Sequence, residues 1–263
     1  MAHMDGFTYG WVNPLLAYVV AVIGAALGLR CTVRALDLPP ERRRGWLFLA
    51  ACSIGCGIWT MHFIAMLGFS VSSATIVYNI PLTLASLLLA IVVVGVGVFY
   101  VGHRPPDTTT LLVGGVLTGG GVAVMHYLGM AAMELNGSVS YNPLVVVLSV
   151  LIAVFAATAA LWMTLNIRKL WASLLSALIA GVAVTAMHYT AMQAVSVRLS
   201  GTEPRSGVPV GQFILPVAVG IVVFLTVAAI TVAMSPREGR EEGVAEPQER
   251  IQVDLFEGRF RGN

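Results

Sequence analysis

Seven long apolar runs dominate this chain, and each is close to the length that crosses a lipid bilayer as a helix. A helix needs about 20 consecutive apolar residues to span the hydrocarbon core. Proline, glycine, asparagine and charged clusters separate the runs, as expected for the connections between membrane helices. The predicted spans are 13–36, 46–69, 80–101, 111–134, 143–165, 170–196 and 212–234.

The composition indicates an all-α membrane protein embedded in the lipid bilayer. Hydrophobic residues make up 57% of the chain and charged residues only 11%, which excludes an ordinary soluble globular protein. We predict one seven-helix membrane domain over residues 1–234. Residues 235–263 are short and polar, and we expect a cytoplasmic tail that does not fold alone.

Basic residues are unevenly divided between the two sides of the predicted bundle. Lysine and arginine accumulate on the cytoplasmic side of membrane proteins, so the bias predicts an outside N terminus and an inside C terminus. Their scatter over inner loops does not resemble a nucleic-acid-binding surface. The inner set is Arg30, Arg34, Arg42, Arg43, Arg44, Arg104, Arg168, Lys169, Arg237, Arg240, Arg250, Arg259 and Arg261, and the outer set is Arg198 and Arg205.

A six-residue motif recurs near the outer end of the second, fourth and sixth spans. Each copy has a histidine flanked by one methionine directly before it and another four residues after it. A histidine within a membrane span is costly, and three in register indicate one shared site. The copies are Met61-His62-Phe63-Ile64-Ala65-Met66, Met125-His126-Tyr127-Leu128-Gly129-Met130 and Met187-His188-Tyr189-Thr190-Ala191-Met192.

The motif belongs to a larger internal repeat. Asn13-Pro14-Leu15, Asn79-Ile80-Pro81-Leu82 and Asn142-Pro143-Leu144 introduce the first, third and fifth spans, and the motif histidines are 64 and 62 residues apart. Such regular spacing predicts three related helical hairpins that run in the same direction. The seventh helix stands outside this scheme.

Glycines are frequent in the three spans that carry the motif. Small residues allow helix backbones to approach closely in lipid, so these spans are predicted to form an inner ring that brings the histidines together. The glycines concerned are Gly55, Gly57, Gly114, Gly115, Gly119, Gly120, Gly121 and Gly181.

The spacing within the motif places imidazole and thioether on one helix face. Residues four apart are neighbours on a helix, so Met66, Met130 and Met192 should form a layer about 6 Å outward from His62, His126 and His188. Met61, Met125 and Met187 lie about 100° away on the helical wheel and would need another role or a neighbouring helix. Glu134 follows Met130 by four residues and is expected on the same face, at the outer mouth.

Imidazole combined with thioether favours a soft metal, and copper, particularly Cu(I), is the leading interpretation. Zinc remains open if only the three imidazoles bind. Haem also remains open, since it needs only one or two histidines. The chain shows no grouping of nucleophile, base and acid, so we predict a protein that is not an enzyme.

The repeated motif resembles that of the MHYT family of bacterial integral membrane sensor domains. Only Met187-His188-Tyr189-Thr190 spells the family's four letters; Phe63-Ile64 and Leu128 depart from them in the other copies. The resemblance implies copper binding, a response to oxygen, carbon monoxide or nitric oxide, and location in the bacterial inner membrane. It also implies a cytoplasmic signalling output, such as a cyclic-di-nucleotide enzyme or a kinase, which we expect either on a longer form of the chain or on a separate partner.

The sequence therefore predicts a copper-binding membrane sensor that responds to a diatomic gas. A second interpretation is a copper-handling protein or an accessory subunit of a membrane metalloenzyme. A haem-binding membrane protein is the third.

Overall fold

A computed structural model describes residues 4–5, 8–72, 74–166, 170–200 and 207–235 of the chain. It contains seven long helices, all of sufficient length and hydropathy to cross a membrane, as predicted. A short 3₁₀ turn, Pro40–Arg42, precedes the second helix. The helices are α1 (Val12–Leu36), α2 (Arg43–Leu67), α3 (Ile80–Gly102), α4 (Thr108–Ala131), α5 (Pro143–Asn166), α6 (Leu170–Gln193) and α7 (Val210–Met234).

Six of the helices form a closed ring. Each of α1 to α5 packs against the next helix in the chain, and α6 returns to pack against α1. Helix α2 is the most buried of the seven, in agreement with its predicted place on the inside, but α6 is no more buried than α1, so the three motif helices do not form a separate inner ring. The histidines of α4 and α6 meet that of α2 within the ring, so the predicted arrangement of three parallel hairpins is confirmed.

Helix α7 runs beside this ring and buries one narrow stripe of side chains. The Nη1 of Arg34 in α1 donates a hydrogen bond to the Val232 carbonyl of α7 at 3.4 Å. The remaining faces of α7 are exposed, as suits a helix that faces lipid. The buried stripe repeats every three to four residues and consists of Ile214, Ala218, Ile221, Leu225 and Ala228.

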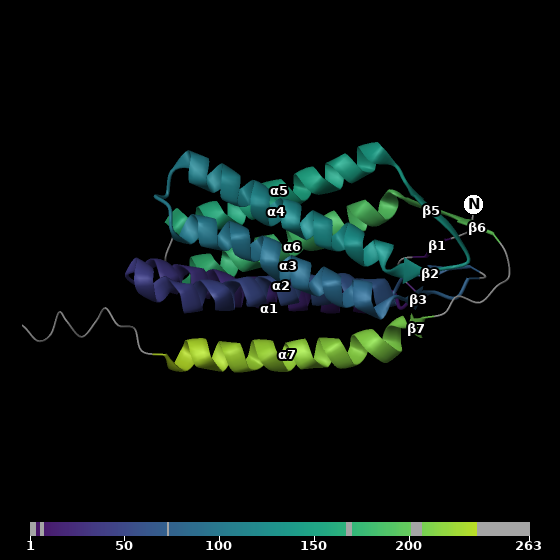
Figure 1. The fold of residues 1–263 in the computed structure, drawn as a ribbon, viewed down its shortest axis with the longest axis horizontal. Coiled ribbons are helices and arrows are strands. Elements are labelled where there is room, and N and C mark those ends of the chain that lie inside the picture. Colours follow the sequence, from purple (N-terminus) through teal and green to yellow (C-terminus); the bar gives the residue numbers. More distant parts are fainter. Residues whose placement is uncertain (1–3, 6–7, 73, 167–169, 201–206, 236–263) are drawn as a thin grey trace, which may run out of the picture. The chain divides into compact units, whose positions relative to one another are not determined.

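Short strands gather at the end of the ring where α2, α4 and α6 finish (Figure 1). They were not predicted, because a strand of two to five residues beside a long apolar helix cannot be distinguished in sequence from a continuation of that helix. The strands are β1 (Met4–Asp5), β2 (Ser70–Val71), β3 (Val77–Tyr78), β4 (Met133–Glu134), β5 (Gly137–Tyr141), β6 (Val195–Leu199) and β7 (Val208–Pro209).

Strand pairing closes each helical hairpin at this end. β1 pairs with β2, β3 with β4 and β5 with β6, always antiparallel, so the strand before each odd-numbered helix joins the strand after its even-numbered partner. β7 adds to the free edge of β3. The predicted spans 111–134 and 170–196 were too long at their ends, because these residues leave the helix to enter β4 and β6.

The asparagines that introduce the odd-numbered helices form hydrogen bonds that also close the hairpins at this end. The backbone N–H of Asn79 donates to the Ala132 carbonyl at 2.9 Å, and that of Asn142 donates to the Ala194 carbonyl at 2.8 Å. In the first hairpin, the Asn13 side-chain amide donates instead to the Ile64 carbonyl at 3.3 Å. The repeated asparagine thus links the start of each hairpin to its end.

Glycine permits close helix contacts in the ring, as predicted at most positions, but the contacts at the predicted glycines join the motif helices to α1, α3 and α5 and not to one another. A Cβ added to Gly57 would lie 2.8 Å from the Cα of Gly24, and one added to Gly119 would lie 2.5 Å from the Cα of Val154. Gly120 was predicted to serve the same purpose, but nothing lies within 4 Å of its added Cβ. That prediction was wrong for Gly120, because this position of α4 points away from its neighbours.

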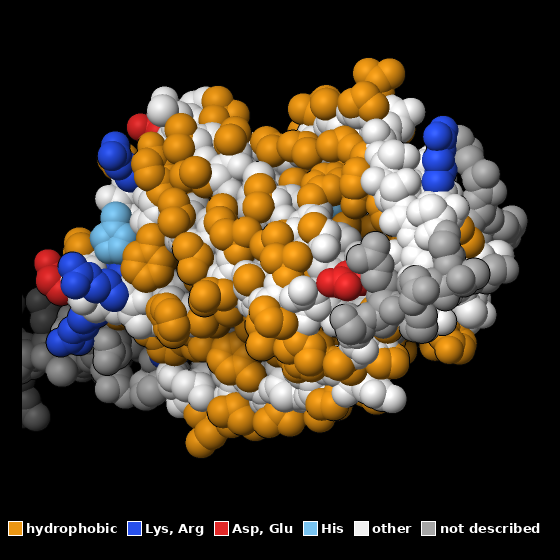
Figure 2. All heavy atoms as spheres, turned by 45° about the vertical axis from the view of Figure 1, so that its right-hand side comes forward, with side chains coloured by type: hydrophobic (Ala, Val, Ile, Leu, Met, Phe, Trp, Pro, Cys, Tyr) orange, Lys and Arg blue, Asp and Glu red, His pale blue; other side chains and the backbone are white. Residues whose placement is uncertain are grey.

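The surface suits a bilayer. Hydrophobic side chains cover much of the face shown in Figure 2, and the Lys and Arg side chains lie toward its left and right ends, whereas one acidic side chain lies nearer the middle. Among the described residues, Arg30, Arg34, Arg42–Arg44 and Arg104 lie toward the end opposite the strands, and Arg198 lies in β6. The inside orientation of the C terminus remains a prediction. The other counted basic residues, Arg168, Lys169, Arg205, Arg237, Arg240, Arg250, Arg259 and Arg261, lie outside the described residues, as do residues 236–263 of the predicted tail.

Candidate metal centre

Three histidines, one from each hairpin, meet in the interior of the ring. His62 is 0% exposed, and His126 and His188 are each 1% exposed. They come from α2, α4 and α6, which run in the same direction, so the motif reaches the same depth in each helix. Among the described residues these three form the one cluster of side chains able to hold a metal ion.

The three imidazoles face one another through the same ring nitrogen. The Nδ1 of His62 lies 3.1 Å from that of His188 and 3.1 Å from that of His126, and the third separation is 3.3 Å. A point equidistant from the three nitrogens lies about 1.8 Å from each, near the roughly 2.0–2.1 Å of a zinc–imidazole bond. The spacing therefore fits one metal ion held by three imidazoles.

The chemistry of imidazole strengthens this fit. A neutral imidazole has one N–H and one lone pair, so a triangle of three Nδ1 atoms cannot satisfy every member by ordinary hydrogen bonds. If all three lone pairs point inward, they repel one another in a region without water. A central cation would remove that repulsion, because each of the three lone pairs could bind it. It would also account for the shared orientation, in which every ring turns its Nδ1 toward the centre.

Two of the other ring nitrogens are buried without a partner in the described part of the chain. Among the described residues, neither the Nε2 of His62 nor that of His126 has a hydrogen-bond partner. A metal-bound histidine usually donates its second N–H to a carboxylate, carbonyl or water. Here the Nε2 of His62 lies against Gly129, where an added Cβ would be 2.6 Å away. Packing against Gly129, and not a hydrogen bond at Nε2, supports this side of the ring.

An aromatic ring after each histidine provides the same support in all three repeats. Phe63, Tyr127 and Tyr189 pack edge-on against the preceding imidazole, with ring centroids 4.7, 4.9 and 5.0 Å apart. The aromatic layer continues outward to the strands, where Tyr78 packs on Phe63 and Tyr141 on Tyr127. Edge-to-face packing of this kind stabilises ring orientation.

The sequence was not used to predict this layer of aromatic rings. A signal was present, since Tyr78-Asn79 and Tyr141-Asn142 repeat the same pair before the third and fifth helices. The Tyr78 hydroxyl is buried and has no hydrogen-bond partner among the described residues. Burial raises the pKa of Tyr78, so the phenol stays neutral at the outer end of the ring.

The motif methionines are mostly buried around the histidines. Met61, Met125 and Met187 are fully buried, Met66 and Met130 are almost fully buried, and Met192 is half-buried. Burial alone does not distinguish a ligand from a packing residue, because methionine is a common filler of apolar interiors. Their role as ligands stays a prediction.

Glu134 does not lie where the helical spacing predicted. The helix ends at Ala131, and Glu134 belongs to β4, opposite Val77. Its Oε1 accepts a hydrogen bond from the Asn79 side-chain amide at 3.4 Å. Glu134 is not among the residues clustered around the three Nδ1 atoms, so it belongs to the strand layer and not to the centre.

The repeats match a known family model, described as "Bacterial signalling protein N terminal repeat", under the name MHYT. The matches cover residues 55–115, 119–177 and 181–245, and each begins seven residues before a motif histidine. With these boundaries, every matched repeat contains the end of a motif helix and the whole of the helix that follows it. Helix α7 therefore takes the place in the third repeat that α3 and α5 take in the first two.

Curated relatives with related sequences are signalling proteins. The chain is 34% identical over 240 residues to the bifunctional diguanylate cyclase/cyclic di-GMP phosphodiesterase MucR of Pseudomonas aeruginosa, covering 89% of this chain and 35% of MucR. It is 32% identical over 212 residues to the cyclic di-GMP phosphodiesterase NbdA of the same organism, covering 76% and 27%. The signalling protein YkoW of Bacillus subtilis is 25% identical over 224 residues, covering 82% and 28%.

The chain thus spans about a third or less of the length of these relatives. No solved structure matches it. The seven apolar helices and the bacterial repeat indicate a multi-pass protein of the bacterial inner membrane. With three matches that together cover more than half of its length, the chain belongs to the MHYT family of bacterial signalling proteins.

Proposed function

We propose that this chain is the metal-binding sensory domain of a bacterial membrane signalling protein, with His62, His126 and His188 as ligands. The observation that carries the proposal is the convergence of three buried Nδ1 atoms within 3.3 Å of one another. Each repeat contributes one ligand. The state of the centre therefore depends on the relative positions of α2, α4 and α6.

Copper is the metal that the surrounding side chains favour. Met66, Met130 and Met192 follow the ligands by one helical turn and would supply soft thioethers on the strand side of the triad. Met61, Met125 and Met187 lie about 100° away from the histidines on their helices, and we propose them as a secondary set around the centre. Hard cations would find no carboxylate in the described cluster.

The two alternatives differ in how well they fit. Zinc accepts three imidazoles with an open fourth position, so the triad alone would serve it. Haem needs an open slot beside its axial ligand, and here two further imidazole nitrogens lie within 3.3 Å of each Nδ1. The crowding argues against haem.

The sensed molecule would be a diatomic gas such as oxygen, carbon monoxide or nitric oxide. Copper held by His62, His126 and His188 would supply the affinity for such a molecule. The chain's residues would keep the triad away from water, because an aromatic ring packs beside each imidazole and the strands close the hairpins above them. A shift of one ligand would move one motif helix against the other two.

The output would lie on the cytoplasmic side, where the C terminus is predicted to be. MucR and NbdA are named as enzymes of cyclic di-GMP metabolism, and the chain matches only 35% and 27% of them. We propose that residues 1–234 form the sensor and that α7 and residues 235–263 pass its state to such a signalling module. This sensor part is predicted to have no catalytic activity of its own.

A copper-handling protein or an accessory subunit of a metalloenzyme is the second candidate. Such a protein must release its metal, and release requires access for a partner or a chelator. The near-complete burial of the three histidines favours retention over transfer. Slow loss of copper to an external chelator would support the sensor, and rapid loss would support the handling protein.

The test is metal analysis of the purified chain in detergent. The wild type should hold about one copper per chain, and His188→Ala should abolish that copper, because two imidazoles leave the site incomplete. His103→Ala is the matched control, since His103 lies outside the centre and is exposed. Equal copper in both variants, or a wild type that refuses added Cu(I), would contradict the proposal.

A further inference from the structure

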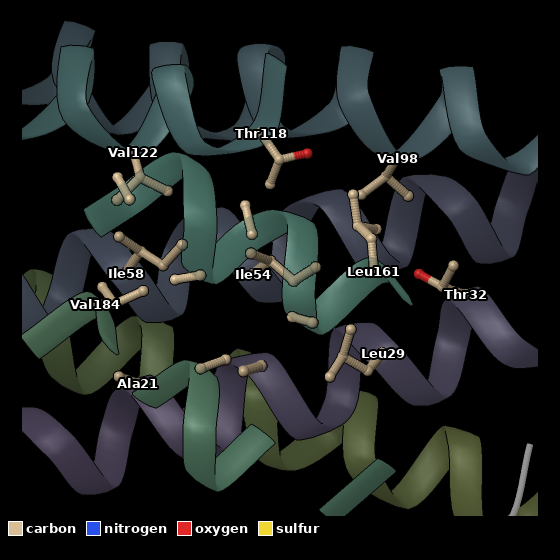
Figure 3. A pocket seen from close by; sticks show the side chains of 16 residues that line it. Ala21, Leu29, Thr32, Ile54, Ile58, Val98, Thr118, Val122, Leu161 and Val184 are labelled. Carbon is tan, nitrogen blue, oxygen red and sulfur yellow. The ribbon is translucent and has the colours of Figure 1, made fainter. Parts of the chain in front are cut away.

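A cavity lies directly beneath the histidine triad, on the side away from the strands. Its volume is about 60 Å³, and Ile58, Val122 and Val184 form the part of its wall nearest the triad (Figure 3). Each of these residues precedes a motif histidine by four positions. One helical turn, about 6 Å along the axis, therefore separates the cavity from the imidazole layer.

Small apolar side chains create this space. Helix α5 faces it with Ala153, Ala156 and Ala157, where larger residues would fill the interior. No charged side chain is among the described residues that line it. An apolar cavity of this kind excludes water and accepts apolar guests such as xenon.

Two threonine hydroxyls border the cavity without making it polar. The Thr32 Oγ1 donates to the Gly28 carbonyl at 2.9 Å, so this hydroxyl is already paired within its own helix. The Thr118 Oγ1 has no partner among the described residues and is almost fully buried. The Thr32 oxygen can still accept a hydrogen bond, but two hydroxyls give a water too few partners, because a buried water typically makes about three hydrogen bonds.

The volume restricts the guest more sharply than the polarity does. Pockets for drug-sized ligands and cofactors measure roughly 300–1,000 Å³, so the cavity is too small for a quinone or a porphyrin. On the same measure as the cavity, one water needs about 10–15 Å³, so the cavity has room for a few molecules of the size of water or dioxygen. The surrounding bilayer supplies apolar solutes of this size.

We propose that this cavity is a binding site for a small apolar molecule of the size of dioxygen, one helical turn from the triad. Its link to sensing rests on the function proposed above, because the cavity would hold the gas one helical turn from the three imidazoles. Binding in the cavity itself requires no metal. The two proposals can therefore fail separately.

Xenon is the probe, because it is apolar and of suitable size. Xenon-129 exchange NMR on the metal-free full chain in detergent should show a saturable bound signal, distinct from xenon dissolved in micelles. Ala156→Val adds two methyl groups to the wall and should abolish that signal. Ala229→Val, an identical change on an exposed position of α7, should retain it.

Ala157→Val is the second filling variant, in case Ala156→Val does not fold. Absence of a bound signal in the wild type would overturn the proposal, as would a signal that survives both filling variants. Copper content is measured on separate, copper-loaded samples of each protein. Copper without bound xenon would retain the metal centre and reject the cavity site; bound xenon without copper would do the reverse.

Discussion

The two halves of the six-helix ring are built on different principles. In the half near the strands, imidazoles, aromatic rings and methionines fill the interior, and strand pairs close each hairpin. In the opposite half, alanine and valine face a cavity of about 60 Å³. The first half holds three ring nitrogens to a narrow geometry, whereas the second retains empty space.

This difference indicates where the chain tolerates change. A site that needs three nitrogens in one small triangle requires neighbours that prevent the rings from turning. The alanine-lined cavity imposes no such requirement, since methyl groups added to its wall would occupy volume that is already empty. Substitutions of similar size should therefore have unequal effects in the two halves.

The largest effect is expected from Gly129→Ala in α4. The new Cβ would lie 2.6 Å from the Nε2 of His62, so the imidazole must turn and the Nδ1 triangle must open. We expect a loss of about 1–3 kcal/mol in the free energy of unfolding. Copper affinity should fall roughly 10–100-fold, as when the support of a ligating histidine is removed.

Gly120→Ala on the same helix is the control, because nothing lies within 4 Å of its added Cβ. It should retain copper and unfold at the same temperature or slightly higher, since alanine favours helix more than glycine does. Competition with a Cu(I) chelator and thermal unfolding measure both properties. Equal copper affinity in the two variants would show that the packing around His62 does not hold its ring.

An intermediate effect is expected from Tyr127→Phe. The Tyr127 hydroxyl lies 2.8 Å from the Ser149 hydroxyl, which joins α4 to α5 just behind the His126 ring. Removing this bond should cost about 0.5–1.5 kcal/mol, while the aromatic ring and the copper remain. Denaturant unfolding monitored by circular dichroism measures the change, with exposed Tyr9→Phe as the comparison.

If Tyr127→Phe abolishes copper without lowering stability, the hydroxyl acts on the centre and the packing explanation fails. If Tyr9→Phe lowers stability as much, the loss does not come from the link between α4 and α5.

The smallest effect is expected at the opposite end, at Asp107. The carboxylate accepts a hydrogen bond from the Thr110 backbone N–H at 2.6 Å and caps α4. This bond holds the pKa of Asp107 below its ordinary value. The stability that it contributes is therefore complete above the ordinary pKa of an aspartate and is lost as the pH falls through the lowered value.

Asp107→Ala should lower the melting temperature slightly at neutral pH and remove part of its decline in acid. Asp107→Asn should keep the cap while losing the pH dependence, because an amide oxygen accepts the same bond without titrating. Melting temperatures from neutral pH down to pH 4 and below test both. A variant profile that parallels the wild type throughout would assign the acid sensitivity to other groups.

Much of the site was predictable because a motif that recurs at the same place in three related hairpins indicates that its copies lie at the same depth. The same register of histidine in three parallel hairpins predicted that His62, His126 and His188 would meet, and they do. The spans were predicted for a similar reason, since each is a long apolar run with clear breaks.

What was not predicted depends on short or absent features. The strands are two to five residues long and follow apolar helices, so Met133–Glu134 was assigned to the preceding span and Glu134 to the wrong face. Gly120 is indistinguishable from Gly119 and Gly121 in sequence, and only the rotation of α4 separates them. The cavity exists because the alanine side chains that line it are too small to fill the interior. No sequence motif indicates such a space.

The division of the triad among three repeats also sets an order in time. His62 and His188 are 126 residues apart in the chain. At about 5–20 residues per second, synthesis of the second takes roughly 6–25 s longer than that of the first. During this interval the growing chain carries imidazoles with no complete partner set. If the triad binds a metal as proposed, the centre can fill only after the third hairpin has entered the membrane, so a filled centre would mark a chain in which all three motif helices are in place.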